Sequence, residues 1–174
     1  EAPALGREVA ELLRKAGERC ATTELLFDHA PVAVVVPHAG LFFSGALAGA
    51  AFDLLRRTWE RVDTFVVFGA CHRMQLGRPA LWDAGAWETP LGAIAVDEEL
   101  AGAFIDDGIG EANPAPHQED NAIELQTPFI RRLFPEAKIR PVAMGFFPES
   151  WEIGRRAARL ARKREGVTLA VAST

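Results

Sequence analysis

A run of five apolar residues, 32–36, constrains the fold of this chain more than any other segment. An apolar, valine-rich run without polar interruption is typical of a strand buried on both faces in the middle of a parallel sheet. Pro37 has no backbone N–H to donate, so the strand is expected to stop there and to deliver His38 into the following loop. Ligands of open α/β sheets bind at the carboxyl ends of strands, so we expect the functional site at this loop.

A second segment repeats this order of apolar run, small residue and histidine. Residues 64–69 are mostly apolar and end at Gly69, and His72 follows shortly after. If the two strands are parallel neighbours, His38 and His72 leave the same edge of the sheet and can converge on one cation or substrate. Neutral imidazole is a common ligand of transition metals, so the two histidines are candidate metal ligands. The alternative is that each histidine only hydrogen-bonds its own turn.

Alternating strands and amphipathic helices indicate the fold class. Two further segments, 138–144 and 167–172, bring the expected strands to four, and Pro141 argues for an edge position or a bulge in the first of them. Right-handed crossovers turn this order into a three-layer α/β domain, with a largely parallel sheet covered by helices on both faces. Turn residues over 78–96 predict an inserted β-hairpin, a kind of insert that can wall a site. Helices are expected at 5–19, at 45–57 with Ser44 as N-cap, at 98–106 after Asp97, at 122–134 and at 148–164.

A polar segment, 117–126, is the second place where chemistry is expected. It carries His117, Glu119 and Glu124 just before or within a predicted helix that also has an apolar stripe. Either glutamate can supply a carboxylate to a metal ion bound by the histidines. The alternative needs no ligand, because an N-cap three residues before an acidic residue forms a capping box.

Composition narrows the function classes. The 174 residues fit one domain, and no apolar run approaches the ~20 residues of a membrane span. With a net charge of −5 and no basic cluster, nucleic acid is a poor candidate partner. The two cysteines, Cys20 and Cys71, suggest neither a disulfide framework nor a zinc site. This cysteine usage and the absence of a secretory signal favour the cytoplasm.

Together the motifs resemble the Memo family, which includes the eukaryotic mediator of cell motility and the bacterial AmmeMemoRadiSam system protein B. The resemblance implies a fold similar to the class III extradiol dioxygenases, which hold a non-haem Fe(II). It places metal contact on His38 and His72, with Fe(II) preferred and Cu or Zn possible. The segments that carry the resemblance are 36–40 with 44–45, 69–72, 87–92, 117–126 and 171–173.

Further site residues follow from the same resemblance and from the polar loop. His117 is the candidate general base, which makes a dioxygenase-like, metal-dependent oxidoreductase a possible activity. An alternative is a non-catalytic module that binds a peptide or partner in the same cleft through Trp82, Trp87, Phe42 and Phe43. The residues expected in the pocket or just outside the metal ligands are Glu124, Glu119, Cys71, Ser44, Trp87 and Glu88.

The chain also departs from the family pattern. It contains no tyrosine, and Asp120 and Asn121 replace a glutamate and a histidine of the family motif. The family continues beyond Ser173 with an Asp-Leu-x-His motif and a later cysteine that completes the proposed metal site. We therefore expect residues 1–174 to form a single Memo-like domain that is incomplete at its C-terminus, binds metal weakly and lacks extradiol cleavage. The substrate and the oligomeric state stay open.

Overall fold

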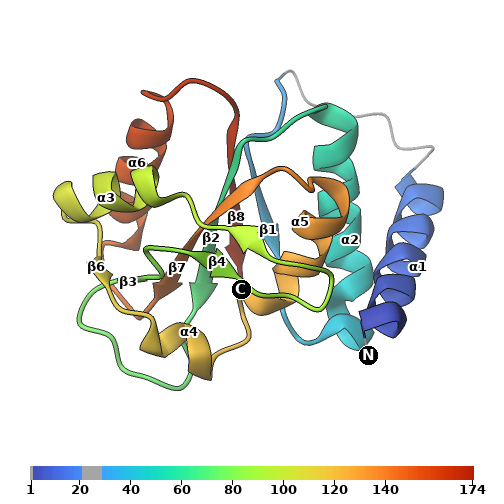
Figure 1. Cartoon of the computed structure of the whole chain (residues 1–174), viewed down its shortest axis with the longest axis horizontal. Coiled ribbons are helices and arrows are strands. Elements are labelled where there is room, and N and C mark those ends of the chain that lie inside the picture. The colour runs from blue at the N-terminus through green and yellow to red at the C-terminus, as the bar shows by residue number, and fades with distance from the viewer. Residues whose placement is uncertain (1, 21–28) are drawn as a thin grey trace.

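A six-stranded sheet lies between two layers of helices in the computed structural model, which describes residues 2–20 and 29–174 (Figure 1). The first four strands in the sheet order run parallel, and β3 runs antiparallel to β7. This arrangement confirms the predicted three-layer, largely parallel α/β fold. The strands in sheet order are β1 (Ala33–Val36), β8 (Thr168–Ser173), β2 (Thr64–Ala70), β7 (Lys138–Met144), β3 (Ala80–Leu81) and β6 (Glu111–Ala112).

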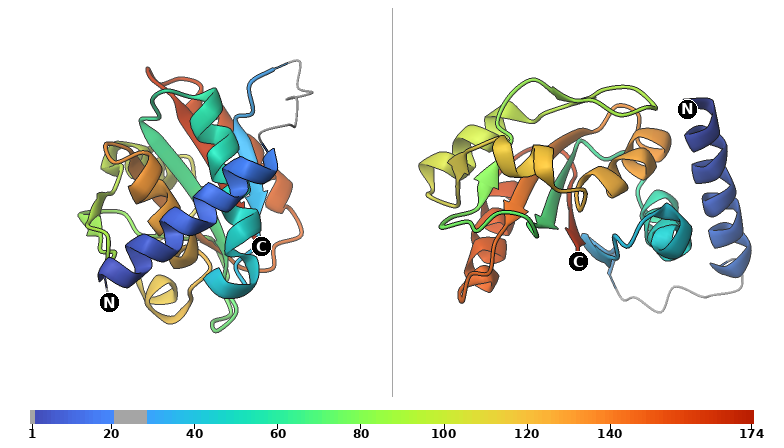
Figure 2. Two further views of the ribbon diagram at one scale, coloured as in Figure 1. Left: turned by 90° about the vertical axis from the view of Figure 1, so that its right-hand side faces the viewer. Right: turned by 90° about the horizontal axis from the view of Figure 1, so that it is seen from below.

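Two hydrophobic cores hold the helices to the two faces of the sheet. On one face, α2 (Leu41–Thr58) and α5 (Thr127–Leu133) pack on the sheet, and α1 (Ala2–Cys20) lies outside α2 (Figure 2). On the other face lie α3 (Glu98–Asp106) and α6 (Ser150–Ala161). Successive side chains of β2 point to opposite faces of the sheet, so β2 contributes to both cores. Phe65 and Val67 pack in the first core, and Val66 packs in the second. None of the helices that the structure describes is long and apolar enough to cross a membrane.

The first strand differs from its prediction in position and burial. In the described sheet, β1 is an edge strand, and Val35 is 71% exposed, so the expectation of a central strand buried on both faces is wrong. Nor are β1 and β2 neighbours, since β8 lies between them and pairs with both. The local apolar pattern does not distinguish a central strand from an edge strand, because sheet order depends on residues far along the chain.

The segments between the strands follow the predictions with local changes. The hairpin is present as β4 (Ala86–Trp87) and β5 (Ile94–Ala95). Helix α2 begins at Leu41 after Gly40, whose φ of 92° suits glycine, so Ser44 is not the N-cap; its hydroxyl donates to the Gly40 carbonyl instead. The predicted helix 122–134 is divided into a 3₁₀ turn, η1 (Glu124–Gln126), and α5. A short helix, α4 (Ala115–Glu119), precedes it.

Candidate functional site

His38 and His72 meet above the carboxyl end of β8. In the sheet register Ser173 lies opposite both Val36 of β1 and Gly69 of β2, so the two flanking strands end at the same level. The loops that follow bring the two imidazole Nε2 atoms to 3.4 Å from each other, with the ring planes at 64°. The structure thus brings together the two histidines that the sequence analysis singled out, although their strands are not adjacent.

Asp120 fixes the His72 side of this pair. Its carboxylate accepts a hydrogen bond from the His72 backbone N–H at 2.6 Å and lies 3.0 Å from His72 Nδ1. It also accepts from the Ala122 N–H at 3.1 Å. Burial raises the pKa of Asp120, but these hydrogen bonds outweigh it and hold the pKa below its usual value. Asp120 is therefore an ionised acceptor beside the His72 ring.

Ser173 occupies the corresponding place on the His38 side. Its hydroxyl lies 3.2 Å from His38 Nδ1 and donates to the Ala122 carbonyl at 2.7 Å. The amide nitrogen of Gln126 donates to the same hydroxyl at 2.9 Å and to the Pro37 carbonyl at 3.2 Å. Burial, and then the neighbouring His72, lower the pKa of His38, so its neutral form is favoured. The outer nitrogens of both rings therefore have fixed partners, and the inner nitrogens face each other.

His117 lies in a different environment from the histidine pair. It is 6% exposed and packs edge-on against Trp82 and Trp87. Its Nε2 donates to the Ala80 carbonyl at 3.0 Å, whereas Nδ1 has no hydrogen-bond partner among the described residues. Burial lowers the pKa of His117 to about 4. At neutral pH His117 is therefore an uncharged, buried imidazole with one free acceptor nitrogen.

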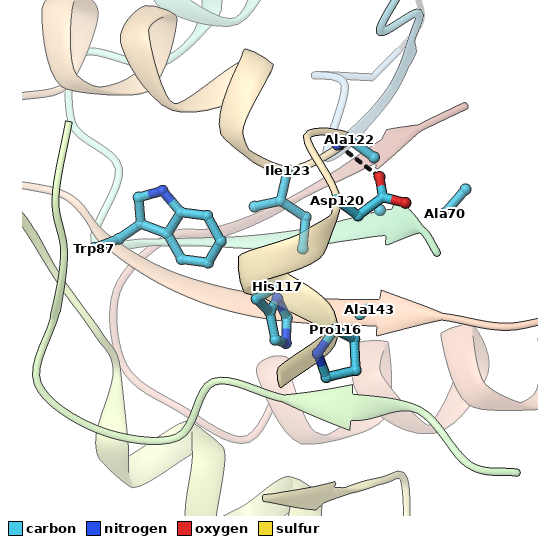
Figure 3. Close-up of a pocket in the computed structure, with 9 residues that line it drawn as sticks. Ala70, Trp87, Pro116, His117, Asp120, Ala122, Ile123 and Ala143 are labelled. Carbon is cyan, nitrogen blue, oxygen red and sulfur yellow. Dashed lines mark hydrogen bonds between the residues drawn. The ribbon is translucent and has the colours of Figure 1, made fainter. Parts of the chain in front are cut away.

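The close-up in Figure 3 shows the small cavity that His117 lines. His117 and Pro116 lie next to each other, Trp87 lies apart from them at the left of the view, and Asp120 lies near Ala122, with which it forms the drawn hydrogen bond. Within the described part of the chain, no hydrogen bond joins His117 to His38 or His72. Its assignment as a general base stays a prediction.

The remaining predicted pocket residues divide into two groups. Glu119 and Glu124 are exposed and line an open polar hollow together with His72. The other four lie in separate local settings. Cys71 donates to the Met74 carbonyl, and Ser44 donates to the Gly40 carbonyl at the start of α2. Trp87 is buried against Trp82, and Glu88 is exposed. Across residues 2–20 and 29–174, no three His, Cys, Asp or Glu side chains are grouped to hold a metal ion. The histidine pair therefore contributes two metal-binding atoms and no more from the described residues.

Three residues of this site were missed as site residues in the sequence analysis: Asp120, Gln126 and Ser173. A usable signal existed for Ser173, which ends a buried apolar run just as His38 and His72 follow theirs. In the sequence Asp120 stands out only as a departure from the family motif. Gln126 carries no signal of its own in the sequence, because its two hydrogen-bond partners are distant along the chain. Ser173 lies 47 positions after it, and Pro37 lies 89 positions before it.

The fold and the site define a class: α/β proteins with a parallel sheet and a polar site at its carboxyl edge. Within this class the chain belongs to the Memo family, since the family model for Memo-like proteins matches residues 4–174. Relatives are named MEMO1 family proteins. The one from Methanococcoides burtonii is 31% identical over 165 residues, which cover 93% of this chain and 60% of that protein.

Two other relatives agree with this assignment. The MEMO1 family protein of Thermococcus onnurineus is 34% identical over 148 residues, which cover 80% of this chain and 50% of that protein. That of Desulfurococcus amylolyticus is 37% identical over 118 residues, which cover 66% of this chain and 41% of that protein. The chain thus spans roughly half the length of these relatives.

Proposed function

We propose that this Memo-family domain binds a divalent transition-metal ion through the Nε2 atoms of His38 and His72. The observation that carries the proposal is their separation of 3.4 Å. Two imidazole nitrogens that share one ion, with bonds of about 2.0–2.1 Å and a near-tetrahedral angle, lie about 3.3–3.4 Å apart. The observed pair fits this requirement without rearrangement.

The donor set also bears on which ion is bound and what it does. Two imidazoles with open positions suit Fe(II), Cu or Zn, and the likeness of the family to extradiol dioxygenases favours Fe(II). Such an ion supplies Lewis-acid and redox chemistry to a bound substrate. This chain's own part is to hold the two rings and to line the approach to His72 with Glu119 and Glu124. Because no third His, Cys, Asp or Glu of the described residues is grouped with the pair, a third ligand would come from outside them.

The test is the metal content of protein purified without chelator. The His38→Ala, His72→Ala double variant is expected to lose the bound transition metal. A matched His29→Ala variant, which removes an exposed histidine elsewhere on the chain, is expected to retain it. Equal metal content in all three proteins contradicts the proposal.

A dioxygenase-like activity is a separate part of the proposal and has its own test. Protein reconstituted anaerobically with Fe(II) is mixed with catechols, and oxygen uptake is followed. We expect metal binding without ring cleavage from these 174 residues, because the turn after His38 has no tyrosine to donate a proton. Catechol-dependent uptake that His117→Ala abolishes would instead establish both the activity and the role of His117 as base.

A second candidate function is the binding of an apolar peptide by the same cleft without catalysis. Phe42 and Phe43, at the start of α2 beside the His38 loop, are 87% and 80% exposed. Exposed aromatic side chains of this kind are common anchors in binding surfaces. Trp82 and Trp87 are less suited to this role, because their rings pack on each other at 5.4 Å.

Selection from a peptide library tests the peptide-binding function separately from metal binding. Apolar peptides that bind the wild-type chain and fail to bind a Phe42→Ser, Phe43→Ser double variant would favour the peptide-binding module. Peptides that bind both proteins equally would remove the argument from these two phenylalanines.

A further inference from the structure

The hydrogen-bond partners of the two histidines determine where their ring protons lie. A neutral imidazole carries one N–H, and the nitrogen that holds the proton is set by the partner of that nitrogen. In this site each Nδ1 has a fixed partner, and each Nε2 faces the other ring. The proton positions can therefore be deduced from the partners alone.

On the His38 side, the partner of Nδ1 is the Ser173 hydroxyl, which already donates its own proton to another acceptor. Ser173 Oγ has one hydrogen to donate, and the Ala122 carbonyl 2.7 Å away can only accept it. The Gln126 amide nitrogen occupies one acceptor position of the hydroxyl, and its orientation is fixed because its other neighbour is the Pro37 carbonyl. The remaining lone pair of the hydroxyl faces His38 Nδ1, which must therefore be the donor.

On the His72 side, the partner is a carboxylate. Both oxygens of Asp120 lie within 3.2 Å of His72 Nδ1, and an ionised carboxylate only accepts. His72 Nδ1 therefore also carries its proton. Ala122 links the two sides, because its N–H donates to Asp120 and its carbonyl accepts from Ser173.

We propose that Ser173, oriented by Ala122 and Gln126, is a positioning residue that holds His38 as the Nδ1–H tautomer, matching the one that Asp120 imposes on His72. The inference rests on the proposed metal site for its functional meaning. Two unprotonated Nε2 atoms then face each other across 3.4 Å before any ion arrives. Two facing lone pairs repel each other, and a shared cation relieves the repulsion, so the arrangement is preorganised for a cation.

The test reads the ring protons directly. Two-bond ¹H–¹⁵N correlation spectra of the metal-free chain near pH 8 distinguish protonated from unprotonated ring nitrogens. We expect Nδ1–H for His38 and His72 in the wild type. In Ser173→Ala, His38 loses its acceptor, and its proton is expected to move to Nε2, where the lone pair of His72 accepts it.

Two matched variants separate this proton effect from general damage. Gln126→Met disturbs the same buried cluster but leaves the serine hydroxyl in place, so His38 should stay Nδ1–H. Ser150→Ala removes a hydroxyl that donates to the Phe147 carbonyl near α6, on the other side of the sheet, and should change neither histidine. Amide dispersion in the same spectra reports whether each variant is folded.

Zinc affinity gives the second readout. Ser173→Ala is expected to weaken Zn²⁺ binding about 10- to 100-fold, the usual effect of removing a hydrogen-bond partner from a metal-bound histidine, and Ser150→Ala should leave it unchanged. A wild-type His38 that carries its proton on Nε2 overturns the inference whether or not zinc binds. A tautomer that Ser173→Ala leaves unchanged also overturns it. Correct tautomers without any zinc binding leave the inference standing and contradict the proposed metal site.

Discussion

Asp120 holds His72 at two points, by its backbone N–H at 2.6 Å and by its ring Nδ1 at 3.0 Å. One carboxylate therefore sets both the path of the loop after β2 and the orientation of the imidazole. Forty-eight residues separate the two partners, so the contact also ties the polar segment before η1 to the sheet edge.

Replacing this carboxylate by an amide should disturb the histidine pair. In Asp120→Asn, the amide has one accepting oxygen for three N–H donors, and its own NH₂ group must face one of them. We expect Zn²⁺ affinity to fall about 10- to 100-fold in competition titrations with a chelating dye. Asp106→Asn, at an exposed acidic residue of α3, is the matched control and should bind as the wild type does. Unchanged affinity in Asp120→Asn would argue against a role for this carboxylate.

Gly69 permits the close approach of β2 to the segment that carries Ala122. A Cβ added at Gly69 lies 2.5 Å from Ile123 Cγ1 and 3.2 Å from the Ala122 Cβ. Gly69→Ala should therefore lower the free energy of unfolding by about 1–3 kcal/mol in urea titrations, because the buried segment must shift. Gly102→Ala, in α3 with nothing within 4 Å of the added Cβ, should instead be neutral or stabilising by about 0.5–1 kcal/mol. Equal stabilities of the two variants would contradict this packing argument.

Burial of His117 makes stability depend on pH. In the folded chain its pKa is lowered to about 4, against 6.5 for an unperturbed histidine. Between these values the unfolded state binds the proton and the folded state does not, so stability falls as the pH falls from about 6.5 to about 4. At about 1.4 kcal/mol per pH unit, the full loss is about 3 kcal/mol.

A His117→Gln variant isolates this contribution, because glutamine does not titrate. The difference in unfolding free energy between wild type and variant should shrink steadily from pH 7 to pH 4, measured by urea denaturation at several pH values. Parallel pH profiles of wild type and His117→Gln would contradict the burial of a neutral imidazole.

The packing of Trp87 against Trp82 in the hairpin region leads to a prediction about the stability contributed by a buried aromatic ring. Trp87 is 8% exposed and packs on Trp82 and His117. Trp87→Ala should cost about 3–5 kcal/mol of unfolding free energy in thermal or urea denaturation, the usual cost of removing a large buried ring. Phe43→Ala removes an 80% exposed ring and should stay within about 0.5 kcal/mol of the wild type. Similar losses of unfolding free energy in both variants would show that the exposed fraction of an aromatic side chain does not predict its contribution to stability here.

The strands were predictable because continuous apolar runs carry a local signal. The apolar run 64–69 differs from β2 by one residue, and the segment 138–144, which also contains Lys138 and Arg140, matches β7 residue for residue. The two-residue strands β3 and β6 were not predicted, since two residues are too short to show a pattern. The sheet order was equally inaccessible, because the place of β8 between β1 and β2 depends on packing between distant segments.

The site was predictable only in part for the same reason. The proximity of His38 and His72 was predictable because each follows an apolar run, and position at a strand end is visible in sequence. The link from Ser173 to His38 spans 135 residues, and no local pattern reports it. Burial of His117 depends on two tryptophans about 30 residues earlier in the chain, so the polar loop suggested a more exposed imidazole than the structure has.

The place of β8 in the sheet has a consequence for synthesis of the chain. β8 is the last of the described strands along the sequence, yet it lies between β1 and β2. Until residues 168–173 emerge from the ribosome, the two flanking strands lack their shared neighbour, and His38 lacks its contact with Ser173. Pairing across such sequence separation is slow, so β1 and β2 keep unpaired edges until β8 is available. The His38 side of the histidine pair can therefore form only after β8 has been inserted between them.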